Sequence, residues 1–312
     1  MAAATRLVVG SRGSRLAVIQ AEELIGQLRD AVPQLELSLV KIRTHGDRDR
    51  KSPLSQIGGR GVFVKELEDA LLKGKIDVAV HSLKDMPSQL APGLRLAAVP
   101  LRCDPRDALV SGSGKTLAQL PSGARIGTGS QRRALELQAF RPDLKACPLR
   151  GNIDTRLSKV CPGELDGVIV AAAALQRMGW QDKVTEYLPV EVFLPAACQG
   201  ALGAEMRTGD GAAATVALVN DEISWQTTAA ERAFLRTMGG GCRSAIAAMA
   251  HVEGDILQIE GMVAGLLSGK TVRAKLAGSR QKPEELGKKL AEKLLDMGAG
   301  KLIDEALLST NQ

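Results

Sequence analysis

The feature that most constrains this fold is the alternation of short apolar runs with amphipathic runs. Residues 7–12 form an apolar run that ends in Gly-Ser-Arg, Ser14 stands at a helix N-cap position, and apolar residues recur at helical spacing over 16–28. Further strand patterns occupy residues 36–42, 77–82, 94–99, 108–111, 125–130 and 167–171. Because strand and helix patterns alternate, the sequence predicts α/β domains whose ligands bind at the carboxyl ends of the strands.

The pattern changes after Ile223. Three strand patterns follow one another directly, and two helical patterns come after them, at residues 245–252, 256–263, 271–277, 283–297 and 302–308. Consecutive strands followed by helices predict a small α+β domain with a three-stranded antiparallel sheet. A strand at 201–205 is expected to return to the first sheet, which makes the second domain an insertion. The predicted domains are residues 1–102 with 200–219, residues 103–199 and residues 220–312.

Composition limits the class of protein. The chain has 312 residues, 45% hydrophobic and 24% charged, which is typical of soluble globular proteins with more than one domain. The longest apolar run, 168–175, is too short to span a bilayer, and the N-terminus lacks the apolar core of a signal peptide, so we expect a cytoplasmic protein with no membrane partner. Five cysteines without a Cys-x-x-Cys pair, and only three histidines, argue against a disulfide framework and a metal site.

The net charge of +6 indicates an anionic partner. Nucleic acid is not expected, because one tyrosine and four phenylalanines leave few rings for base stacking. Arginines near strand-to-helix turns are a more specific signal, since guanidinium groups and helix N-termini together bind carboxylates or phosphates. These arginines are Arg12, Arg132, Arg133, Arg150 and Arg156. The alternative is a set of solvated arginines beside ordinary serine caps.

Asp85 is the candidate catalytic carboxylate. It follows the strand at 77–82, next to Lys84 and two residues before Pro87, at the strand end where α/β sheets bind ligands. The alternative is an aspartate that only caps a turn. A polar stretch at 44–61 is expected to be a lid over a site or a connection between elements.

Cys242 follows three consecutive glycines that end a helical pattern at 225–235. Glycines give the backbone conformational freedom, so one interpretation is a thiol that carries a covalent group on a flexible segment. The alternative is a small buried hydrophobic residue after an ordinary helix end. The cysteine alone does not decide between the two.

Several independent motifs occur in one order along nearly the whole chain. They are Gly10-Ser-Arg-Gly-Ser14, Gly58-Gly-Arg-Gly-Val-Phe-Val-Lys-Glu66, His81-Ser-Leu-Lys-Asp-Met-Pro87, Asp104-Pro-Arg-Asp107, Gln131-Arg-Arg133, Arg150-Gly-Asn152 with Thr155-Arg-Leu-Ser-Lys159, Gln199-Gly200 and Gly240-Gly-Cys242. With these motifs the chain resembles the porphobilinogen deaminases, also called hydroxymethylbilane synthases. The number of motifs makes the resemblance highly specific.

The resemblance implies a transferase of tetrapyrrole and haem biosynthesis. Such an enzyme joins four porphobilinogen molecules head to tail on a covalent primer, releases ammonia and yields the linear tetrapyrrole hydroxymethylbilane. The resemblance also implies that Cys242 carries a dipyrromethane cofactor through a thioether, that Asp85 is the catalytic aspartate and that the enzyme is a monomer. The implied fold has two periplasmic-binding-protein-like α/β domains with a hinge, together with the C-terminal α+β domain.

The resemblance further implies which side chains bind the acetate and propionate groups of the pyrrole rings. These residues are Arg12, Ser14, Lys84, Ser130, Arg132, Arg133, Arg150 and Arg156. The other residues that it implies for the cleft and its lid are Phe63, Gln199, Gly200 and Arg243.

The chain departs from the family pattern without losing a catalytic position, at Arg15, Gly129, Gln131, Cys198 and Ala245. Cys198 is a candidate second reactive thiol, a hypothesis that fails if thiol labelling finds it unreactive; ordinary burial is the alternative. A rival function is a non-catalytic, two-lobed anion-binding protein. That rival explains the arginines but leaves Asp85, Cys242 and the third domain without a role. A degenerate family member is disfavoured because the catalytic positions are all present.

Overall fold

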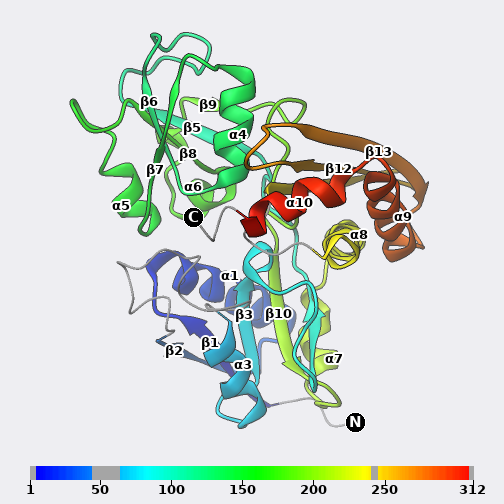
Figure 1. The fold of residues 1–312 in the computed structure, drawn as a ribbon. Coiled ribbons are helices and arrows are strands. Elements are labelled where there is room, and N and C mark those ends of the chain that lie inside the picture. The colour runs from blue at the N-terminus through cyan, green and yellow to red at the C-terminus, as the bar shows by residue number, and fades with distance from the viewer. Residues whose placement is uncertain (1–4, 44–63, 240–244, 309–312) are drawn as a thin grey trace. The chain divides into compact units, whose positions relative to one another are not determined.

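The computed structural model describes residues 5–43, 64–239 and 245–308. Its contacts divide the chain into two compact units, residues 1–103 with 200–226 and residues 104–199 with 227–312. Figure 1 labels most of the helices and strands of both units. The second unit holds the second α/β sheet and the C-terminal sheet, so the boundaries of the three predicted domains stay a prediction.

A five-stranded sheet lies at the centre of the first unit. Its strand order is β2-β1-β3-β10-β4; β1 runs parallel to β2 and β3, while β10 runs antiparallel to β3 and β4. The strands are β1 (Arg6–Arg12), β2 (Glu36–Ile42), β3 (Val78–Ser82), β4 (Leu94–Ala98) and β10 (Leu202–Arg207). The helices are α1 (Arg15–Ala31), α3 (Lys65–Leu72) and α7 (Ala213–Val216), with the 3-10 turns η1 (Leu83–Asp85) and η3 (Ala217–Val219). The predicted return of a late strand to this sheet is confirmed.

Different helices cover the two faces of this sheet, because side chains alternate along each strand. Val78 and Val80 of β3 pack in one core with α1. Ala79 packs in another core with α3. The same two-residue period places His81 on the α3 face, directly before the predicted catalytic turn.

The first sheet of the second unit repeats this arrangement. Its order is β7-β6-β8-β5-β9; β6 runs parallel to β7 and β8, and β5 runs antiparallel to β8 and β9. The strands are β5 (Asp107–Ser111), β6 (Arg125–Thr128), β7 (Lys145–Pro148), β8 (Gly167–Ala171) and β9 (Glu186–Tyr187). The helices are α4 (Gln131–Phe140), α5 (Ile153–Leu157) and α6 (Ala172–Arg177), with the 3-10 turn η2 (Gln181–Lys183). In both sheets the fourth strand is therefore the antiparallel one.

The C-terminal part of the second unit is the predicted α+β arrangement. Three antiparallel strands, in the order β11-β12-β13, pack against helices around Phe234 and Leu290. The elements are α8 (Glu222–Met238), β11 (Ala245–Glu253), β12 (Ile256–Ala264), β13 (Thr271–Ser279), α9 (Pro283–Asp296) and α10 (Ala299–Leu308). A Cβ on Gly287 would lie 2.0 Å from the carbonyl oxygen of Ala230, so only glycine lets α9 approach α8 this closely.

The sequence patterns located most of these elements. The strand predicted at 167–171 and the helix start after Ser130 agree with the structure. Two short strands were not predicted, β7 and β9. Both lie at the edges of their sheet and are largely exposed or half-buried, so they lack the apolar pattern that marks a buried strand.

Candidate functional site

Three of the predicted site residues lie outside the described residues: Phe63, Cys242 and Arg243. The predicted lid at 44–61 does as well. The other predicted residues are divided between the two units.

The turn between β1 and α1 carries Arg12 and Ser14. The Oγ of Ser14 accepts a hydrogen bond from the backbone N–H of Ala17 at 3.4 Å, which confirms Ser14 as the N-cap of α1. Arg12 is the last residue of β1 and is half-buried. The turn therefore combines a guanidinium group with the positive end of a 17-residue helix.

Asp85 ends the turn η1 directly after β3 and is exposed. Among the described residues it makes no hydrogen bond or ion pair. Lys84, half-buried, precedes it in the same turn. Ser82, at the end of β3, accepts a hydrogen bond of 2.8 Å from the amide of Gln20 on α1, which ties the strand end to that helix. The carboxylate is thus presented from an anchored strand end.

A buried pair lies behind this turn. The Nε2 of His81 is 3.0 Å from the Oε2 of Glu205 on β10, and the two side chains are 4% and 0% exposed. The Oε1 of Glu205 is buried and has no hydrogen-bond partner in the described part of the chain. Burial raises the pKa of Glu68 on α3, Glu205 raises it further and His81 lowers it. The strand that leads to Asp85 therefore rests on a cluster of titratable groups.

In the second unit, Arg132 and Arg133 lie in the first turn of α4. Ser130 is the N-cap of this helix, and its Oγ accepts from the N–H of Arg133 at 3.4 Å. Both arginines are buried, and both donate to Asp107, from Arg132 Nη2 at 2.8 Å and from Arg133 Nη2 at 2.7 Å. Asp107 is the fully buried first residue of β5. Two guanidinium groups thus share one carboxylate.

Further partners fix the two guanidinium groups in place. Arg132 Nη1 donates to Glu136 Oε2 at 2.6 Å and to the carbonyl oxygen of Leu194 at 2.8 Å. Arg133 Nη2 donates to Gln199 Oε1 at 3.2 Å. The predicted carboxylate-binding pair is therefore already engaged by side chains of the protein itself.

The two acids of this cluster have opposite pKa shifts. Burial alone would raise the pKa of Asp107, but Arg132 and Arg133 hold it well below its usual value. Burial also raises the pKa of Glu136, which Arg132 lowers only in part and Asp107 raises further, so the net value is about 7. Asp107 is thus ionised at neutral pH, and Glu136 is near its midpoint.

One N–H donor of the pair Arg132 and Arg133 is not satisfied by the described residues. The Nε of Arg133 is buried and has no hydrogen-bond partner within the described ranges. A buried polar group without a partner costs about 1–3 kcal/mol, so this N–H favours an acceptor brought by a ligand. Guanidinium groups bind carboxylate oxygens best. The cluster therefore fits a group that carries carboxylates.

Arg150 and Arg156 form a more accessible pair. Arg150 is exposed in the turn between β7 and α5, and Arg156 on α5 is half-buried and donates from Nε to the carbonyl oxygen of Gly151 at 2.8 Å. A Cβ on Gly129 would lie 2.5 Å from the carbonyl oxygen of Leu149 and 3.9 Å from Arg156 Nη2. The turn before α4 and the turn before α5 are therefore in contact, which explains the glycine at 129.

Gln199 joins the buried arginine cluster. It is 1% exposed, and its amide donates to Asp107 Oδ1 at 2.8 Å. Gly200 has a φ of 90°, which favours glycine. Cys198 has a φ of 63° and is 1% exposed, and its thiol lies 3.8 Å from the carbonyl oxygen of Thr228. This burial favours the ordinary structural interpretation of Cys198, which thiol labelling has still to test.

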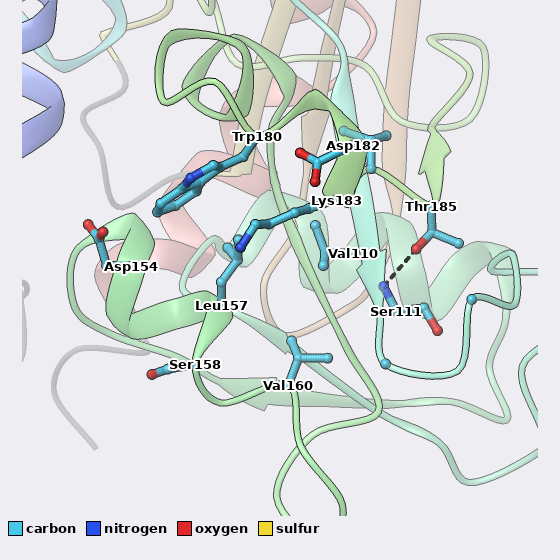
Figure 2. Close-up of a pocket in the computed structure, with 13 residues that line it drawn as sticks. Val110, Ser111, Asp154, Leu157, Ser158, Val160, Trp180, Asp182, Lys183 and Thr185 are labelled. Carbon is cyan, nitrogen blue, oxygen red and sulfur yellow. Dashed lines mark hydrogen bonds between the residues drawn. The ribbon is translucent and has the colours of Figure 1, made fainter.

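A separate open pocket of about 800 Å³ lies elsewhere in the second unit (Figure 2). Trp180 and Lys183 line it, with the Lys183 ammonium 4.9 Å from the centre of the Trp180 ring, and Asp154 lies on α5. None of the predicted site residues is among the residues that line this pocket. We therefore do not assign the pocket to the candidate site.

Among the described residues, no three His, Cys, Asp or Glu side chains are grouped so that they could hold a metal ion. No helix in the described ranges has the length and hydropathy needed to cross a bilayer.

The sequence patterns did not indicate roles for the acids of these clusters or for His81. Asp107 closes the motif Asp104-Pro-Arg-Asp107, and Glu136 stands four residues after Arg132, one helical turn away. Glu205 is a single acid inside an apolar strand. A charged residue in an apolar strand, or at helical spacing from a site arginine, is the signal that could have found them.

Comparisons with known proteins match nearly the whole chain. The family model described as porphobilinogen deaminase, dipyromethane cofactor binding domain, matches residues 7–215, and the model for the porphobilinogen deaminase C-terminal domain matches residues 225–296. A porphobilinogen deaminase of Syntrophus aciditrophicus is 48% identical over 300 residues, covering 96% of this chain and 98% of that protein. One from Roseiflexus castenholzii is 46% identical and covers 95% and 98%.

Among solved structures, substrate-binding domain 2 of Lactococcus lactis GlnP aligns at a TM-score of 0.43 and 12% identity, over 77% of this chain and 93% of that one. The α/β class is confirmed by the strand orders themselves rather than by this likeness.

Proposed function

The chain belongs to the porphobilinogen deaminase family, and we propose that Asp85 and the arginines divide the family's reaction between them. Enzymes of this family are transferases that join four porphobilinogen molecules head to tail on a dipyrromethane primer, with release of ammonia and formation of hydroxymethylbilane. The observation that carries the proposal is that the chain has both an exposed carboxylate at a strand end, without a partner among the described residues, and arginines at helix starts.

Asp85 is proposed to act on the reacting pyrrole. Its exposed carboxylate accepts hydrogen bonds from pyrrole N–H groups and stabilises the cationic azafulvene that remains when ammonia leaves the substrate. Since its anchored turn fixes the position of the charge, little reorganisation is needed when the cation forms.

The arginines are proposed to bind the acetate and propionate groups. Arg133 offers its buried Nε, while Arg150 and Arg156 offer side chains at the surface. Arg12, Ser14, Lys84 and Ser130 are proposed as further carboxylate partners, in keeping with the helix starts that Ser14 and Ser130 cap. Gln199 and Gly200 stay proposed cleft residues, and Phe63 and Arg243 are proposed with them.

Cys242 is the proposed attachment point of the dipyrromethane. When bound, that group supplies the pyrrole carbon to which the first substrate is joined. The residues of this chain bind its carboxylates and keep the growing product in place. The mass of the intact protein, measured beside Cys242→Ser, tests the attachment: an excess of two porphobilinogens less two ammonias should appear in the wild type alone.

The role of Asp85 is tested by Asp85→Ala. We expect turnover to fall by at least about 100-fold, as for other losses of a group that stabilises developing charge. The fold should be unchanged, because the side chain is exposed. Asp30→Ala, which removes another exposed acid of the same unit, is the control and should retain full ammonia release. Retained turnover in Asp85→Ala would contradict the assignment, and binding without any ammonia release in the wild type would favour a carboxylate-binding protein.

We further propose that the enzyme works as a monomer in the cytoplasm. The described cysteines, Cys103, Cys147, Cys161 and Cys198, are thiols, in keeping with a reducing compartment. Light scattering during size-exclusion chromatography tests the monomer, and a mass of two chains would contradict it.

A further inference from the structure

Glu136 joins the arginine cluster to the segment that follows β9. Its Oε2 accepts from Arg132 Nη1 at 2.6 Å, and its Oε1 accepts from the backbone N–H of Leu194 at 2.8 Å. Its side chain is 5% exposed. Both carboxyl oxygens are therefore in use, one on a cation and one on a backbone amide.

The charges of the cluster balance only when Glu136 is ionised. Arg132 and Arg133 are permanently charged, and Asp107 is held ionised by them. The cluster is neutral when Glu136 carries a charge and has one positive charge when Glu136 is protonated. Since burial raises the pKa of Glu136 to about 7, the two states have similar free energies at neutral pH.

A ligand carboxylate that binds the unsatisfied Nε of Arg133 changes the charge balance of the cluster. It adds a negative charge beside two acids that already share the arginines, and like charges at short range favour protonation of the weaker acid. Asp107 accepts from both guanidinium groups and from Gln199, whereas within the described ranges Glu136 accepts from one guanidinium group, that of Arg132. Glu136 is therefore the group that takes up the proton.

We propose that Glu136 is a positioning residue that holds Arg132 in the absence of ligand, and that carboxylate binding at the arginine pair is coupled to proton uptake by Glu136. This inference rests on the proposed function of the pair. With Glu136 ionised, the empty cluster has a net charge of zero, and the net charge is zero again once a carboxylate is bound and Glu136 is protonated. The bound carboxylate then meets no excess negative charge.

Other charged groups near α4 do not replace Glu136. β11, which packs against α4, has two charged or titratable side chains near its C-terminal end, His251 and Glu253, and both are exposed. β6 and β7, which also contact α4, start with exposed side chains, Arg125 and Lys145. On the segment after β9, the N–H of Cys198 is bound to Glu231 of α8.

The experiment is a calorimetric titration of the full-length Cys242→Ser protein, which cannot load the cofactor, with porphobilinogen as the probe. Two buffers of different ionisation enthalpy report the number of protons taken up. The probe's own carboxyl and amino groups, near pH 4 and pH 10, do not titrate between about pH 6 and pH 8.5. We expect uptake of about half a proton at pH 7, rising toward one at higher pH, because half of Glu136 is ionised at its midpoint of about 7.

Glu136→Gln in the same background imitates the protonated state. It should abolish the proton uptake and make Kd independent of pH, whereas Kd of the parent should rise by up to about tenfold per pH unit above 7. Glu285→Gln is the matched control, since Glu285 forms an exposed i,i+4 ion pair with Lys289 at 2.6 Å; it should behave like the parent. Equal proton uptake by Glu136→Gln and the parent would overturn the coupling.

A different measurement shows whether the proposed carboxylate-binding function of the arginine pair is itself wrong. Binding that does not weaken when Arg133 is replaced by Lys would show that the arginine pair is not the carboxylate site, whatever the proton count. Infrared difference spectroscopy of the parent protein tests the coupling without a Glu136 variant. A protonated-carboxyl band should appear in the spectra when porphobilinogen is added. Its absence at pH 8 would also overturn the coupling.

Discussion

The two five-stranded sheets have the same arrangement of strands, yet their buried acids have different partners. Each has a fully buried carboxylate on its antiparallel fourth strand, Glu205 on β10 and Asp107 on β5. Glu205 contacts the imidazole ring of His81 at 3.0 Å. Asp107 contacts two guanidinium groups, those of Arg132 and Arg133, at 2.8 and 2.7 Å. The sheet that carries Asp85 thus has an imidazole against its buried acid, and the sheet that carries the arginine pair has two permanent cations.

The largest loss of unfolding free energy is expected when the carboxylate of Asp107 is removed. Asp107→Asn keeps the shape but leaves two buried guanidinium groups without their shared carboxylate, and breaking a buried pair costs about 3–5 kcal/mol. Urea unfolding at pH 7 measures this loss of unfolding free energy. Asp143→Asn, which breaks an exposed pair with Arg141, should have a much smaller effect. Similar losses in the two variants would mean that burial does not set the cost.

The pH dependence of stability should separate Glu136 from the other acids. Because its pKa in the fold is raised from 4.5 to about 7, its contribution to stability is complete below pH 4.5 and is lost as the pH rises through about 7. We expect the wild type to lose on the order of 2–3 kcal/mol in this window relative to Glu136→Gln, which cannot titrate. Parallel curves of unfolding free energy for the two proteins would contradict the raised pKa.

Removing His81 should cost less than removing Asp107. His81→Gln takes away one hydrogen-bond partner of the buried Glu205, whereas Asp107→Asn takes the shared carboxylate from two guanidinium groups, so we expect a loss of about 2 kcal/mol of unfolding free energy. Urea unfolding at pH 7 measures it beside Asp107→Asn. A loss as large as that of Asp107→Asn would show that the number of partners does not set the cost.

The smallest effect on stability is expected at the glycines that precede the two capping serines, Ser14 and Ser130. Gly129→Ala places a Cβ 2.5 Å from the carbonyl oxygen of Leu149, so it should destabilise by about 1–2 kcal/mol and disturb the turn that contacts Arg156. Gly13→Ala, at the matching position before Ser14, meets no atom within 4 Å and should be nearly neutral. Thermal unfolding of both variants is the check, and equal shifts in Tm would refute the role of the close approach.

Local patterns predicted much of the fold and part of the candidate site. Alternating apolar runs located the strands β1, β3 and β8, and the serine caps located the starts of α1 and α4, because both depend on residues close in sequence. Asp85 was placed correctly after β3 for the same reason. The strands β7 and β9 were missed, because they are short and their side chains are mostly exposed or half-buried, so no apolar pattern marks them.

The sequence by itself determined which residues are charged, where the serine-capped helices α1 and α4 begin and which family the motifs resemble. Only the tertiary structure decided that Arg132 and Arg133 are buried on Asp107, and that His81 meets Glu205 across 124 positions of sequence. The physical reason is that the charge state of a buried acid depends on which cations fold against it and on how much water they exclude. Those neighbours come from distant parts of the chain, and no local pattern specifies them.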